Sequence, residues 1–478
     1  MYNVLIRPLK REDALISYQW RNDPDIWKFT GHRPDKIITQ EIELDWIQRV
    51  LNEKDSCRFA ILVDNIYIGN IQITNITLEE EGEYHIFIGE KDYWGKGIAS
   101  LATWQLLRYA KERLNLKRLY LFVNPLNKPA IKVYERCGFI KVSDKIKMVF
   151  DLSRDLRPTV SVFMITYNHE AYIRQAVESI LCQKTNFDFD IVIGEDCSTD
   201  STRSIVMSIA DQYPGKFKLL LHEKNIGAMA NQMAVFSACT GKYVAMCEGD
   251  DYWTDPLKLQ KQVDHLEANP EIVVSFTDYS IVDNKGILIK ESKLVPEAKR
   301  HLNQEDLIIR HGIQILTAVF RGEPLRNNPN TKYINGDIAL FAYLANFGEA
   351  GYLDIISGCY RISERGVYSS KEDGCKILIR RGMYMNLLNY KLTTNPIALQ
   401  QQIQNLNFGL FNHYFNNGNV LRSLNVLASG VIFDLRHLRL FFITRFFKRL
   451  KRKILNITGP RQAMKILTFL GFIELVSV

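Results

Sequence analysis

The stretch Val160-Ser-Val-Phe-Met-Ile-Thr-Tyr-Asn168 begins a regular alternation of short apolar runs and amphipathic segments. The apolar runs predict strands at 160–166, 189–195, 217–222 and 242–248, and the segments between them predict helices at 170–182, 200–212 and 227–239. Strands that alternate with helices in this way form a parallel sheet, because each helix returns the chain to the same end of the sheet. We therefore expect a mostly parallel, Rossmann-like α/β sheet in the middle of the chain.

Polar side chains follow each of the first four expected strands. The four groups are Thr166-Tyr167-Asn168, Glu195-Asp196, 223–225 and Glu248-Gly-Asp-Asp251. In an open parallel sheet, ligands bind outside the carboxyl ends of the strands, so these four loops are expected to meet at one crevice. Any single loop has a structural alternative, because Asn and Asp are common helix N-caps. The four together predict a ligand site.

The last of these groups contains clustered carboxylates. Glu248, Asp250 and Asp251 repel one another unless a cation or hydrogen-bond donors offset their charge. Mg²⁺ or Mn²⁺, held by one or two carboxylates and by substrate phosphates, would neutralise a departing diphosphate. The alternative is an acidic turn on the surface.

Three longer phrases contain or extend these groups: Gly194-Glu-Asp-Cys-Ser-Thr-Asp-Ser-Thr202, Asn225-Ile-Gly227 and Cys247-Glu-Gly-Asp-Asp-Tyr-Trp253. Together with the opening stretch, they resemble family-2 glycosyltransferases of the GT-A fold. The resemblance implies a nucleotide sugar, UDP- or dTDP-linked, bound by Thr166, Tyr167, Asn168, Glu195, Asp196, Asn225 and Asp250. It also implies a metal ion, Mn²⁺ or Mg²⁺, at Asp250 and Asp251. The family's DxD motif normally begins with Asp, whereas this motif begins with Glu248, which leaves open which acid contacts the ion.

Two later phrases resemble the acceptor half of the same family, Asn335-Gly-Asp-Ile-Ala-Leu-Phe341 and Tyr360-Arg-Ile-Ser-Glu-Arg-Gly-Val-Tyr-Ser369. Asp337 falls where the family's catalytic base lies. Direct displacement at the anomeric carbon needs a base to deprotonate the attacking hydroxyl, so the resemblance implies inversion of configuration. The alternative for Asp337 is an N-cap of the helix that begins there.

The residues before Pro158 have a different pattern. Strands are expected at 59–63, 66–75, 83–90 and 117–123, with helices between and after them, so residues 1–152 predict a separate mixed α/β domain. The polar, proline-containing segment 152–159 marks the boundary. The expected domains are therefore 1–152, 158–370 and a helical region 371–478.

Within the first domain, the phrase Gly89-Glu-Lys-Asp-Tyr-Trp-Gly-Lys-Gly-Ile-Ala99 follows a strand and opens a helix expected from Ile98 to Leu114. Its glycines let the backbone approach a ligand, and the N–H groups of the helix start can hold a pyrophosphate. With Asn124-Pro-Leu-Asn-Lys-Pro-Ala-Ile-Lys-Val-Tyr-Glu-Arg-Cys-Gly-Phe139, it resembles the GNAT family of acetyl-CoA-dependent N-acetyltransferases.

The GNAT resemblance implies that acetyl-CoA is held by Gly95, Lys96, Gly97, Ile98, Ala99 and Asn127, and that Tyr134 is catalytic. A phenol with a pKa near 10 can return a proton to a leaving thiolate with a pKa of about 8.5. The alternative for Tyr134 is a core aromatic. Trp94 stands where the family usually has Arg or Gln, and the general base stays open among Glu83, His85 and Glu90.

The surplus of positive charge is concentrated near the C-terminus. The net charge is +8, and the segment from Arg436 to Lys453 contains eight basic residues and no acidic one. The remainder is nearly neutral, which argues against a nucleic-acid binder. The mixture of aromatic residues and cations within 437–454 fits a helix at an anionic membrane surface, and equally a solvated basic helix.

The eight cysteines include no C-x-x-C pair and predict reduced thiols. No signal peptide and no uninterrupted apolar run of spanning length are found, so we expect a cytoplasmic protein, with peripheral contact at the inner face of the membrane as an option.

These expectations combine into a bifunctional transferase of surface-polysaccharide synthesis. The first domain would acetylate an amine, with a nucleotide-linked amino sugar as the favoured substrate, and the second would transfer a sugar to a glycan or lipid-linked acceptor. Two alternatives stay open. One is a protein N-terminal acetyltransferase fused to an unrelated glycosyltransferase, and the other is a chain in which one domain is a degenerate binding module or scaffold.

Overall fold

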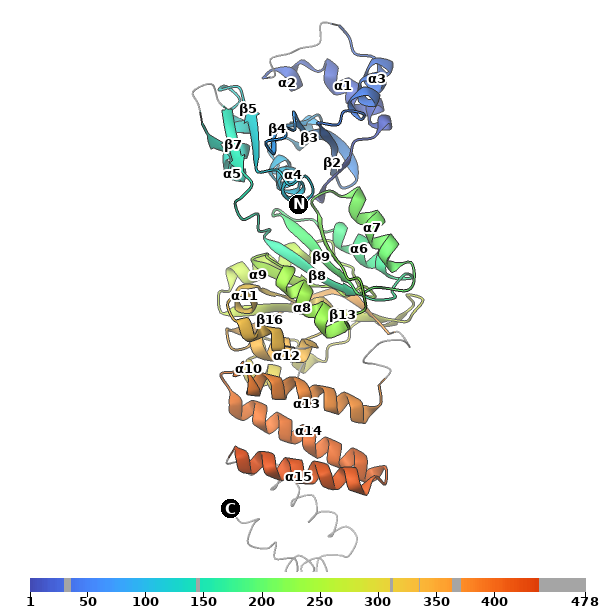
Figure 1. Cartoon of the computed structure of the whole chain (residues 1–478), viewed down its shortest axis with the longest axis vertical. Coiled ribbons are helices and arrows are strands. Elements are labelled where there is room, and N and C mark those ends of the chain that lie inside the picture. Colours follow the sequence, from blue (N-terminus) through green and yellow to red (C-terminus); the bar gives the residue numbers. More distant parts are fainter. Residues whose placement is uncertain (30–35, 143–146, 310–312, 335, 363–370, 438–478) are drawn as a thin grey trace, which may run out of the picture.

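The computed structural model describes residues 1–29, 36–142, 147–309, 313–334, 336–362 and 371–437. These residues form three bodies stacked along the long axis of the molecule, with the N-terminus near the junction of the first two (Figure 1). The fold class is the expected one: a mixed α/β domain, a second α/β domain with a parallel sheet at its centre, and a helical C-terminal region. The basic run beyond His437 lies outside the described residues.

The first domain is built on a sheet of seven strands in the order β1-β2-β3-β4-β5-β7-β6. All neighbours are antiparallel except β4 and β5, which are parallel. The strands are β1 (Val4–Pro8), β2 (Cys57–Val63), β3 (Ile66–Thr74), β4 (Glu81–Ile88), β5 (Arg118–Phe122), β6 (Ile140–Lys141) and β7 (Lys147–Asp151). The helices are α1 (Ala14–Asn22), α2 (Pro24–Trp27), α3 (Gln40–Val50), α4 (Ile98–Glu112) and α5 (Lys128–Cys137).

Side chains of successive residues on β4 face opposite sides of this sheet, as in any strand. Tyr84 is buried on the side of α4 and α5, where its hydroxyl lies 2.7 Å from Thr103 Oγ1 and its ring packs edge-on against Tyr134. Phe87 points the other way, and its ring packs against Trp20 and Trp27 from α1 and α2. The two layers of helices therefore cover the two faces of β4.

The second domain contains a sheet of nine strands in the order β10-β9-β8-β11-β15-β13-β16-β12, with β14 paired to β13. Its strands are β8 (Val160–Thr166), β9 (Phe189–Glu195), β10 (Phe217–Leu221), β11 (Tyr243–Met246), β12 (Tyr252–Trp253), β13 (Ile272–Val282), β14 (Leu288–Lys290), β15 (Val319–Arg321) and β16 (Glu349–Arg361). Its helices are α6 (Ile173–Leu181), α7 (Thr202–Gln212), α8 (Ala228–Ala238), α9 (Lys258–Ala268), α10 (Gln304–Ile309), α11 (Glu323–Arg326) and α12 (Gly336–Leu344).

The expected parallel part of this sheet is confirmed, since β10, β9, β8 and β11 pair parallel with one another. The remaining half of the sheet was not predicted from the sequence. There, β15 pairs antiparallel with both β11 and β13, and β16 then pairs parallel with β13. Every residue of β9 and β11 is buried, as expected for strands covered by helices on both faces.

The C-terminal region consists of α13 (Asp373–Asn389), α14 (Pro396–Asn416) and α15 (Val420–Arg436). The three helices are layered below the second domain, each packed on the previous one (Figure 1). Tyr384 of α13 anchors the stack by donating a hydrogen bond of 2.7 Å to the Ile308 carbonyl. Among the described residues, none of the helices has both the length and the apolar character needed to cross a bilayer.

A buried ion pair joins the first two domains. Arg108 of α4 makes a two-pronged pair with Asp188, just before β9, and its Nε donates to the Gly215 carbonyl at 2.8 Å. Gly215 lies so close to α4 that a Cβ atom there would be 1.9 Å from the Gln105 carbonyl oxygen. Its φ of +70° also favours glycine. The second domain is therefore fixed directly to α4.

Two further buried charges lie behind this ion pair. Burial raises the pKa of Asp190 to about 6, although Arg108 opposes the shift. Burial lowers the pKa of Lys216 to about 7, and its ammonium donates to the Phe189 carbonyl at 2.8 Å. At the rim of the same junction, Lys184 pairs with Asp64 of the first domain at 3.0 Å.

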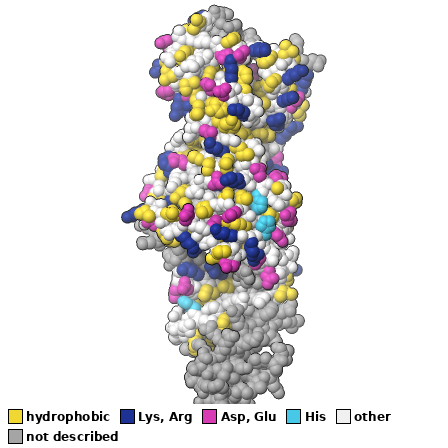
Figure 2. Space-filling view, turned by 180° about the vertical axis from the view of Figure 1, so that it is seen from behind, with side chains coloured by type: hydrophobic (Ala, Val, Ile, Leu, Met, Phe, Trp, Pro, Cys, Tyr) yellow, Lys and Arg dark blue, Asp and Glu magenta, His cyan; other side chains and the backbone are white. Residues whose placement is uncertain are grey.

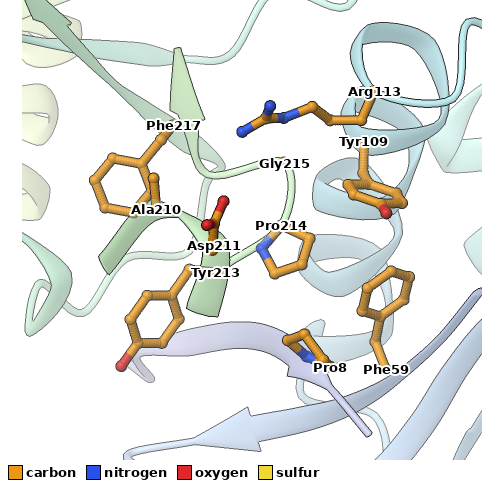
Figure 3. A pocket seen from close by; sticks show the side chains of 10 residues that line it. All are labelled: Pro8, Phe59, Tyr109, Arg113, Ala210, Asp211, Tyr213, Pro214, Gly215 and Phe217. Atoms are coloured by element: carbon orange, nitrogen blue, oxygen red, sulfur yellow. The ribbon is translucent and has the colours of Figure 1, made fainter. Parts of the chain in front are cut away.

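A hollow of about 260 Å³ lies at the edge of the junction (Figure 3). Its walls are rings from both domains, Phe59 and Tyr109 on one side and Tyr213 on the other, with Arg113 and Asp211 beside them. On the face shown in Figure 2, basic and acidic side chains are interspersed over the described surface.

Candidate functional sites

Three carboxylates come together at the turn between β11 and β12. Glu248, Asp250 and Asp251 each offer one oxygen, and these oxygens all lie within 4.8 Å of one another. Gly249 lets the turn lie against the end of β8, because a Cβ atom there would be 2.7 Å from Thr166 Oγ1. The prediction of clustered carboxylates at the carboxyl end of this strand is confirmed in position. We call residues 248–251 the acidic turn.

The electrostatics of the acidic turn fit a divalent cation. Burial raises the pKa of Glu248 to about 8, with the charges of Asp250 and Asp337 as further causes. Burial, followed by the charge of Asp250, raises the pKa of Asp251 well above its usual value. Asp251 is only 1% exposed, and its Oδ2 atom has no hydrogen-bond partner among the described residues. A hard cation with oxygen ligands would satisfy that atom and offset the repulsion.

Asp337 lies at the start of α12, and its charge acts on Glu248, which places it beside the acidic turn. Its Oδ1 accepts a hydrogen bond of 2.8 Å from the backbone N–H of Ile338. Gly336, with φ of +81°, precedes it against Met383 of α13. From Ile338 to Leu344 every residue of α12 is buried, so the helix holds Asp337 at a fixed place. Asn335, which begins the quoted phrase, lies outside the described residues.

The loop after β9 is tied to the loop after β10 through Asp196. Its carboxylate accepts hydrogen bonds from the backbone N–H groups of Ile226 at 2.7 Å and Gly227 at 3.0 Å. The side-chain amide of Asn225 donates to the Asp196 carbonyl at 3.1 Å. The two predicted residues are thus brought together, and their hydrogen bonds join the two loops.

Glu195 and Asn168 also bond to the protein itself. Glu195 is fully buried, pairs with Arg203 and accepts from the Ser198 N–H at 2.7 Å. Asn168, with φ of +55°, accepts from the Thr199 N–H at 2.8 Å through its side-chain oxygen. Asn168 therefore holds the loops after β8 and β9 in contact at the end of the sheet, while Glu195 joins the loop after β9 to α7.

Thr166 and Tyr167 differ in exposure. Thr166 is buried, with its hydroxyl 3.3 Å from His169 Nδ1, whereas Tyr167 is 39% exposed and has its ring available for stacking. His169 Nε2 lies 4.0 Å from Asp250 Oδ2, so a histidine that sequence reasoning passed over borders the acidic turn. The sequence signal that could have identified His169 was its position three residues after the end of β8.

Arg361 is the second residue that sequence reasoning missed, although it lies within a quoted phrase. Its backbone N–H donates to Asp251 Oδ1 at 2.9 Å, and its Nε donates to the Asp250 carbonyl at 3.0 Å. The two partners are more than a hundred residues earlier in the chain. Nothing local in the sequence connects them.

In the first domain, the predicted glycine loop lies at the start of α4. Gly95 has φ of +74° and Gly97 has φ of +80°, and a Cβ atom at either position would meet nothing within 4 Å. The glycines are therefore needed for conformation, and the space around them is open to a ligand. Ile98 and Ala99 begin α4, while the Lys96 ammonium lies over the Tyr2 and Tyr93 rings. Trp94 is 46% exposed, and its indole N–H donates to the Ile88 carbonyl at 2.9 Å.

The sheet of the first domain opens next to this loop. β4 and β5 pair only from Glu81 to Glu83 with Arg118 to Tyr120. From Tyr84 to Ile88, β4 continues to pair with β3 but has no strand partner on the β5 side among the described residues. Backbone donors and acceptors on that side of β4 are left for a ligand that lies along the strand.

Tyr134 of α5 lies behind the unpaired part of β4. Its ring centroid is 5.9 Å from that of Tyr84, and burial raises its pKa to about 12. The phenol is therefore protonated at neutral pH, as a proton donor must be. Asn127 caps α5 by accepting from the Ala130 N–H at 3.2 Å, so it has the structural role of an N-cap here.

Two of the three candidate bases face away from α5, on the other side of β4. His85 Nε2 lies 3.6 Å from Glu83 Oε1 and 3.0 Å from Thr74 Oγ1. Burial lowers the pKa of His85, with Glu83 opposing the shift, so the imidazole is neutral at pH 7. Glu90 instead accepts from the Trp20 indole at 2.9 Å.

Glu83 and His85 line a polar hollow of about 440 Å³. Two more carboxylates, Glu53 and Asp55, border it together with Arg58. The hollow is rich in negative charge and lies on the face of β4 that points away from α5. β4 is also the strand whose edge is open on the β5 side. Glu83 and His85 were named from the sequence, whereas the two acids from the loop before β2 belong to no motif that could have revealed them.

Comparisons with known proteins divide the chain in the same way. Residues 3–140 match the model of the acetyltransferase (GNAT) domain, and residues 161–322 match that of glycosyl transferase family 2. An uncharacterized protein of Mycobacterium tuberculosis is 37% identical over 212 residues, 44% of this chain and 61% of that protein. The chain thus spans less than two thirds of the length of this relative.

Two named relatives match one part of the chain each. The putative teichuronic acid biosynthesis glycosyltransferase TuaG of Bacillus subtilis is 28% identical over 223 residues, 46% of this chain and 85% of that protein. The spermidine N(1)-acetyltransferase of Escherichia coli is 24% identical over 181 residues, 38% of this chain and 95% of that enzyme. Among solved structures, S. aureus TarS 1-349 in complex with UDP-GlcNAc has a TM-score of 0.42 at 19% identity, covering 57% of this chain and 81% of that one.

Proposed function

Because the chain joins an acetyltransferase (GNAT) domain to a glycosyl transferase family 2 domain, we propose that it is a bifunctional transferase of surface-polysaccharide synthesis. The first domain acetylates the amine of a nucleotide-linked amino sugar, with acetyl-CoA as donor. The second transfers a sugar from a UDP- or dTDP-linked donor to a glycan or lipid-linked acceptor. The name of the TuaG relative supports the polysaccharide context.

The observation that carries the glycosyl-transfer half is the position of Asp337 beside the acidic turn. Asp337 takes the proton of the attacking acceptor hydroxyl, and the hydroxyl oxygen then attacks the anomeric carbon from the side opposite the diphosphate. The configuration at that carbon is inverted. Asp250 and Asp251 would hold Mn²⁺ or Mg²⁺, which would neutralise charge on the departing diphosphate.

For the acetyl-transfer half, the support comes from the opening between β4 and β5 and the residues on its two sides. The pyrophosphate of acetyl-CoA lies at Gly95 to Ala99, where backbone N–H groups of the α4 start are free to bind it. A neutral His85 beside Glu83 accepts the proton of the incoming amine, directly or through water. Tyr134 returns a proton to the departing thiolate.

A second amine class is favoured by one specific observation, the carboxylates that border the polar hollow. A linear di- or triamine carries positive charges that these carboxylates would bind, and the relative from Escherichia coli is named for spermidine. Peptide N-termini are the third class.

Mass spectrometry of the full chain with acetyl-CoA and a panel of amines tests the acetyl-transfer half. The panel contains UDP- and dTDP-linked amino sugars, spermidine and peptides with free N-termini. An acetyl mass gain on an amino sugar nucleotide supports the shared pathway. A gain on spermidine or peptides alone contradicts it, and Tyr134→Phe serves as the control with strongly reduced enzyme-catalysed transfer.

Release of UDP from UDP-sugars in the presence of glycan acceptors and Mn²⁺ tests the other half. Asp337→Asn is the informative variant, because it removes the base while keeping the shape of the side chain. We expect it to bind UDP as the wild type does and to lose transfer. Loss of both properties would show that Asp337 supports the crevice and is not its base.

We place both reactions in the cytoplasm, where nucleotide sugars and acetyl-CoA are available. Contact of the basic run from Arg436 to Lys453 with the inner face of the membrane is part of the proposal. Sedimentation of the full chain with vesicles containing anionic lipid tests it, with neutral vesicles as the control.

A further inference from the structure

Arg361, the last residue of β16, connects the acidic turn to two other segments of the second domain. Its Nε donates to the Asp250 carbonyl at 3.0 Å, one terminal nitrogen to the Asp283 carbonyl at 3.1 Å, and the other to Gln175 Oε1 at 2.7 Å. Asp283 follows β13 and Gln175 lies on α6. One planar group therefore links the acidic turn to the sheet end and to a helix.

The guanidinium is held in place by two rings as well. It lies 4.6 Å from the centroid of Tyr172 and 5.6 Å from that of Tyr252, and Arg361 is only 4% exposed. Tyr252 belongs to β12, which pairs with β16 directly after the acidic turn. Stacked rings and bonds to three acceptors leave the side chain little freedom.

The guanidinium of Arg361 leaves the carboxylate oxygens of the acidic turn available. Its guanidinium bonds to the carbonyl of Asp250, and only its backbone N–H reaches a carboxylate, at Asp251 Oδ1. Asp251 Oδ2 has no partner among the described residues. The guanidinium thus brings a positive charge near three carboxylates without itself bonding to any of their oxygens.

We propose that Arg361 is the positioning residue of the cation site: its guanidinium fixes the acidic turn so that Glu248, Asp250 and Asp251 present their oxygens to one divalent ion. The inference rests on the proposed glycosyl transfer, since that function calls for the ion. It assigns a role to a residue that contacts neither the ion nor the sugar. Removing the guanidinium should therefore weaken binding of the ion before it affects the fold.

Arg361→Lys is the sharpest test, because lysine keeps the charge but cannot bridge three acceptors in one plane. Binding of Mn²⁺ to the full chain, alone and with UDP, is measured by the loss of the free-ion electron paramagnetic resonance signal. Residues that orient metal ligands typically contribute a factor of about 10 to 100 to affinity, and we expect a loss of this size. Melting temperature is measured in parallel to show that the variant stays folded at the assay temperature, and acetyl-CoA affinity is expected to stay at the wild-type value.

Arg321→Lys is the matched control. Arg321 lies on β15 of the same sheet and its guanidinium also bonds backbone carbonyls, those of Ile272 at 2.9 Å and Leu266 at 2.6 Å. Neither of these partners belongs to the acidic turn. We expect this variant to bind Mn²⁺ as the wild type does, so an equal loss in both variants would overturn the positioning role.

The remaining outcomes separate this inference from the proposed function. If Arg361→Lys binds Mn²⁺ normally while Asp250→Asn does not, the cation site stands and the role of Arg361 is wrong. If the wild type binds no Mn²⁺ with or without UDP, the cation site itself is wrong and this inference falls with it. Should Arg361→Lys fail to fold, Gln175→Ala decides by the same criteria, because it removes one partner of the guanidinium and leaves the arginine in place.

Discussion

The two candidate sites of this chain are built in opposite ways. In the second domain, the loops after β8, β9 and β10 are bonded to one another through Asn168 and Asp196, and the carboxylates of the acidic turn are half-buried or buried. In the first domain, the glycine loop has open space around it and one edge of β4 lacks a strand partner among the described residues. The first arrangement uses side chains that other residues hold in place before a ligand binds. The second leaves backbone donors and acceptors whose hydrogen bonds a ligand would complete.

This difference indicates which kind of substitution should impair each site. A fixed cluster of like charges should be sensitive to the removal of a charge, since an ion bound there would depend on every carboxylate. An open backbone site is sensitive to conformation, since its donors are correct only while the glycines keep their positive φ angles. Substitutions that change charge should therefore impair mainly the second domain, and substitutions that change backbone conformation should impair mainly the first.

The largest expected effect is the loss of sugar transfer in Asp250→Asn. We expect a fall on the order of 10³-fold, because the substitution removes charge stabilisation of the departing diphosphate, while acetyl transfer stays unchanged. UDP release and acetyl-CoA consumption measure the two activities. Asp211→Asn, which removes an exposed carboxylate of α7, is the control. A parallel loss of both activities would contradict the independence of the two sites.

Tyr134→Phe should impair the other activity: acetyl transfer should fall about 10²-fold, and sugar transfer should be unaffected. Because burial raises the pKa of Tyr134 to about 12, the wild-type phenol stays protonated, and its ionisation should cause no loss of acetyl transfer up to pH 10. Rates measured from pH 6 to 10 check this. Tyr109→Phe, at the interdomain hollow, provides the comparison, and an equal loss there would indicate a packing effect.

A smaller effect is expected for Gly97→Ala. An alanine at φ of +80° costs about 1 to 2 kcal/mol, and relaxation of the loop would move the N–H groups at the start of α4. We expect acetyl-CoA affinity to fall about tenfold, as measured by calorimetry. Gly418→Ala carries a similar strain, with φ of +72° and open space around it, between α14 and α15. It should lose comparable stability and keep acetyl-CoA affinity; a loss there too would mean that strain alone is responsible.

The smallest effect is a change in stability that touches neither site. Burial raises the pKa of Asp190 from 3.8 to about 6, so the folded state binds its proton more tightly than the unfolded state does. The stability contribution of that proton is lost as the pH rises from about 4 through 6. Asp190→Asn should therefore raise the melting temperature relative to the wild type at pH 8 and not at pH 4, with both activities intact. A difference independent of pH would contradict the assignment.

The parts of the fold that follow from local pattern were predicted well. The four expected strands of the second domain correspond to β8, β9, β10 and β11, and the C-terminal helices to α13, α14 and α15. The strands expected at 59–63, 66–75 and 117–123 are β2, β3 and β5. β1 and the helices α1 to α3 were not identified, because their short amphipathic segments are ambiguous without the sheet that they cover.

For the sites, sequence predicted which residue types gather at the strand ends but not how they bond. Asp196 and Glu195 were expected to hold the nucleotide, and the structure shows each bonded to neighbouring loops. Their role with a nucleotide stays a prediction. Arg361 could not be connected to the acidic turn, since the contact depends on β16 returning beside β12. Long-range pairing of this kind leaves no local periodicity.

The close fit of Gly215 against α4 has a consequence for the history of such chains. Two enzymes on a loose tether can be exchanged by recombination at the tether, since neither half depends on the other's surface. Here, a new first domain would have to bring an arginine at the position of Arg108 and a helix backbone shaped for Gly215. We therefore expect the two halves to be inherited as a pair, and homologous chains that contain both should retain or replace the two contact residues together.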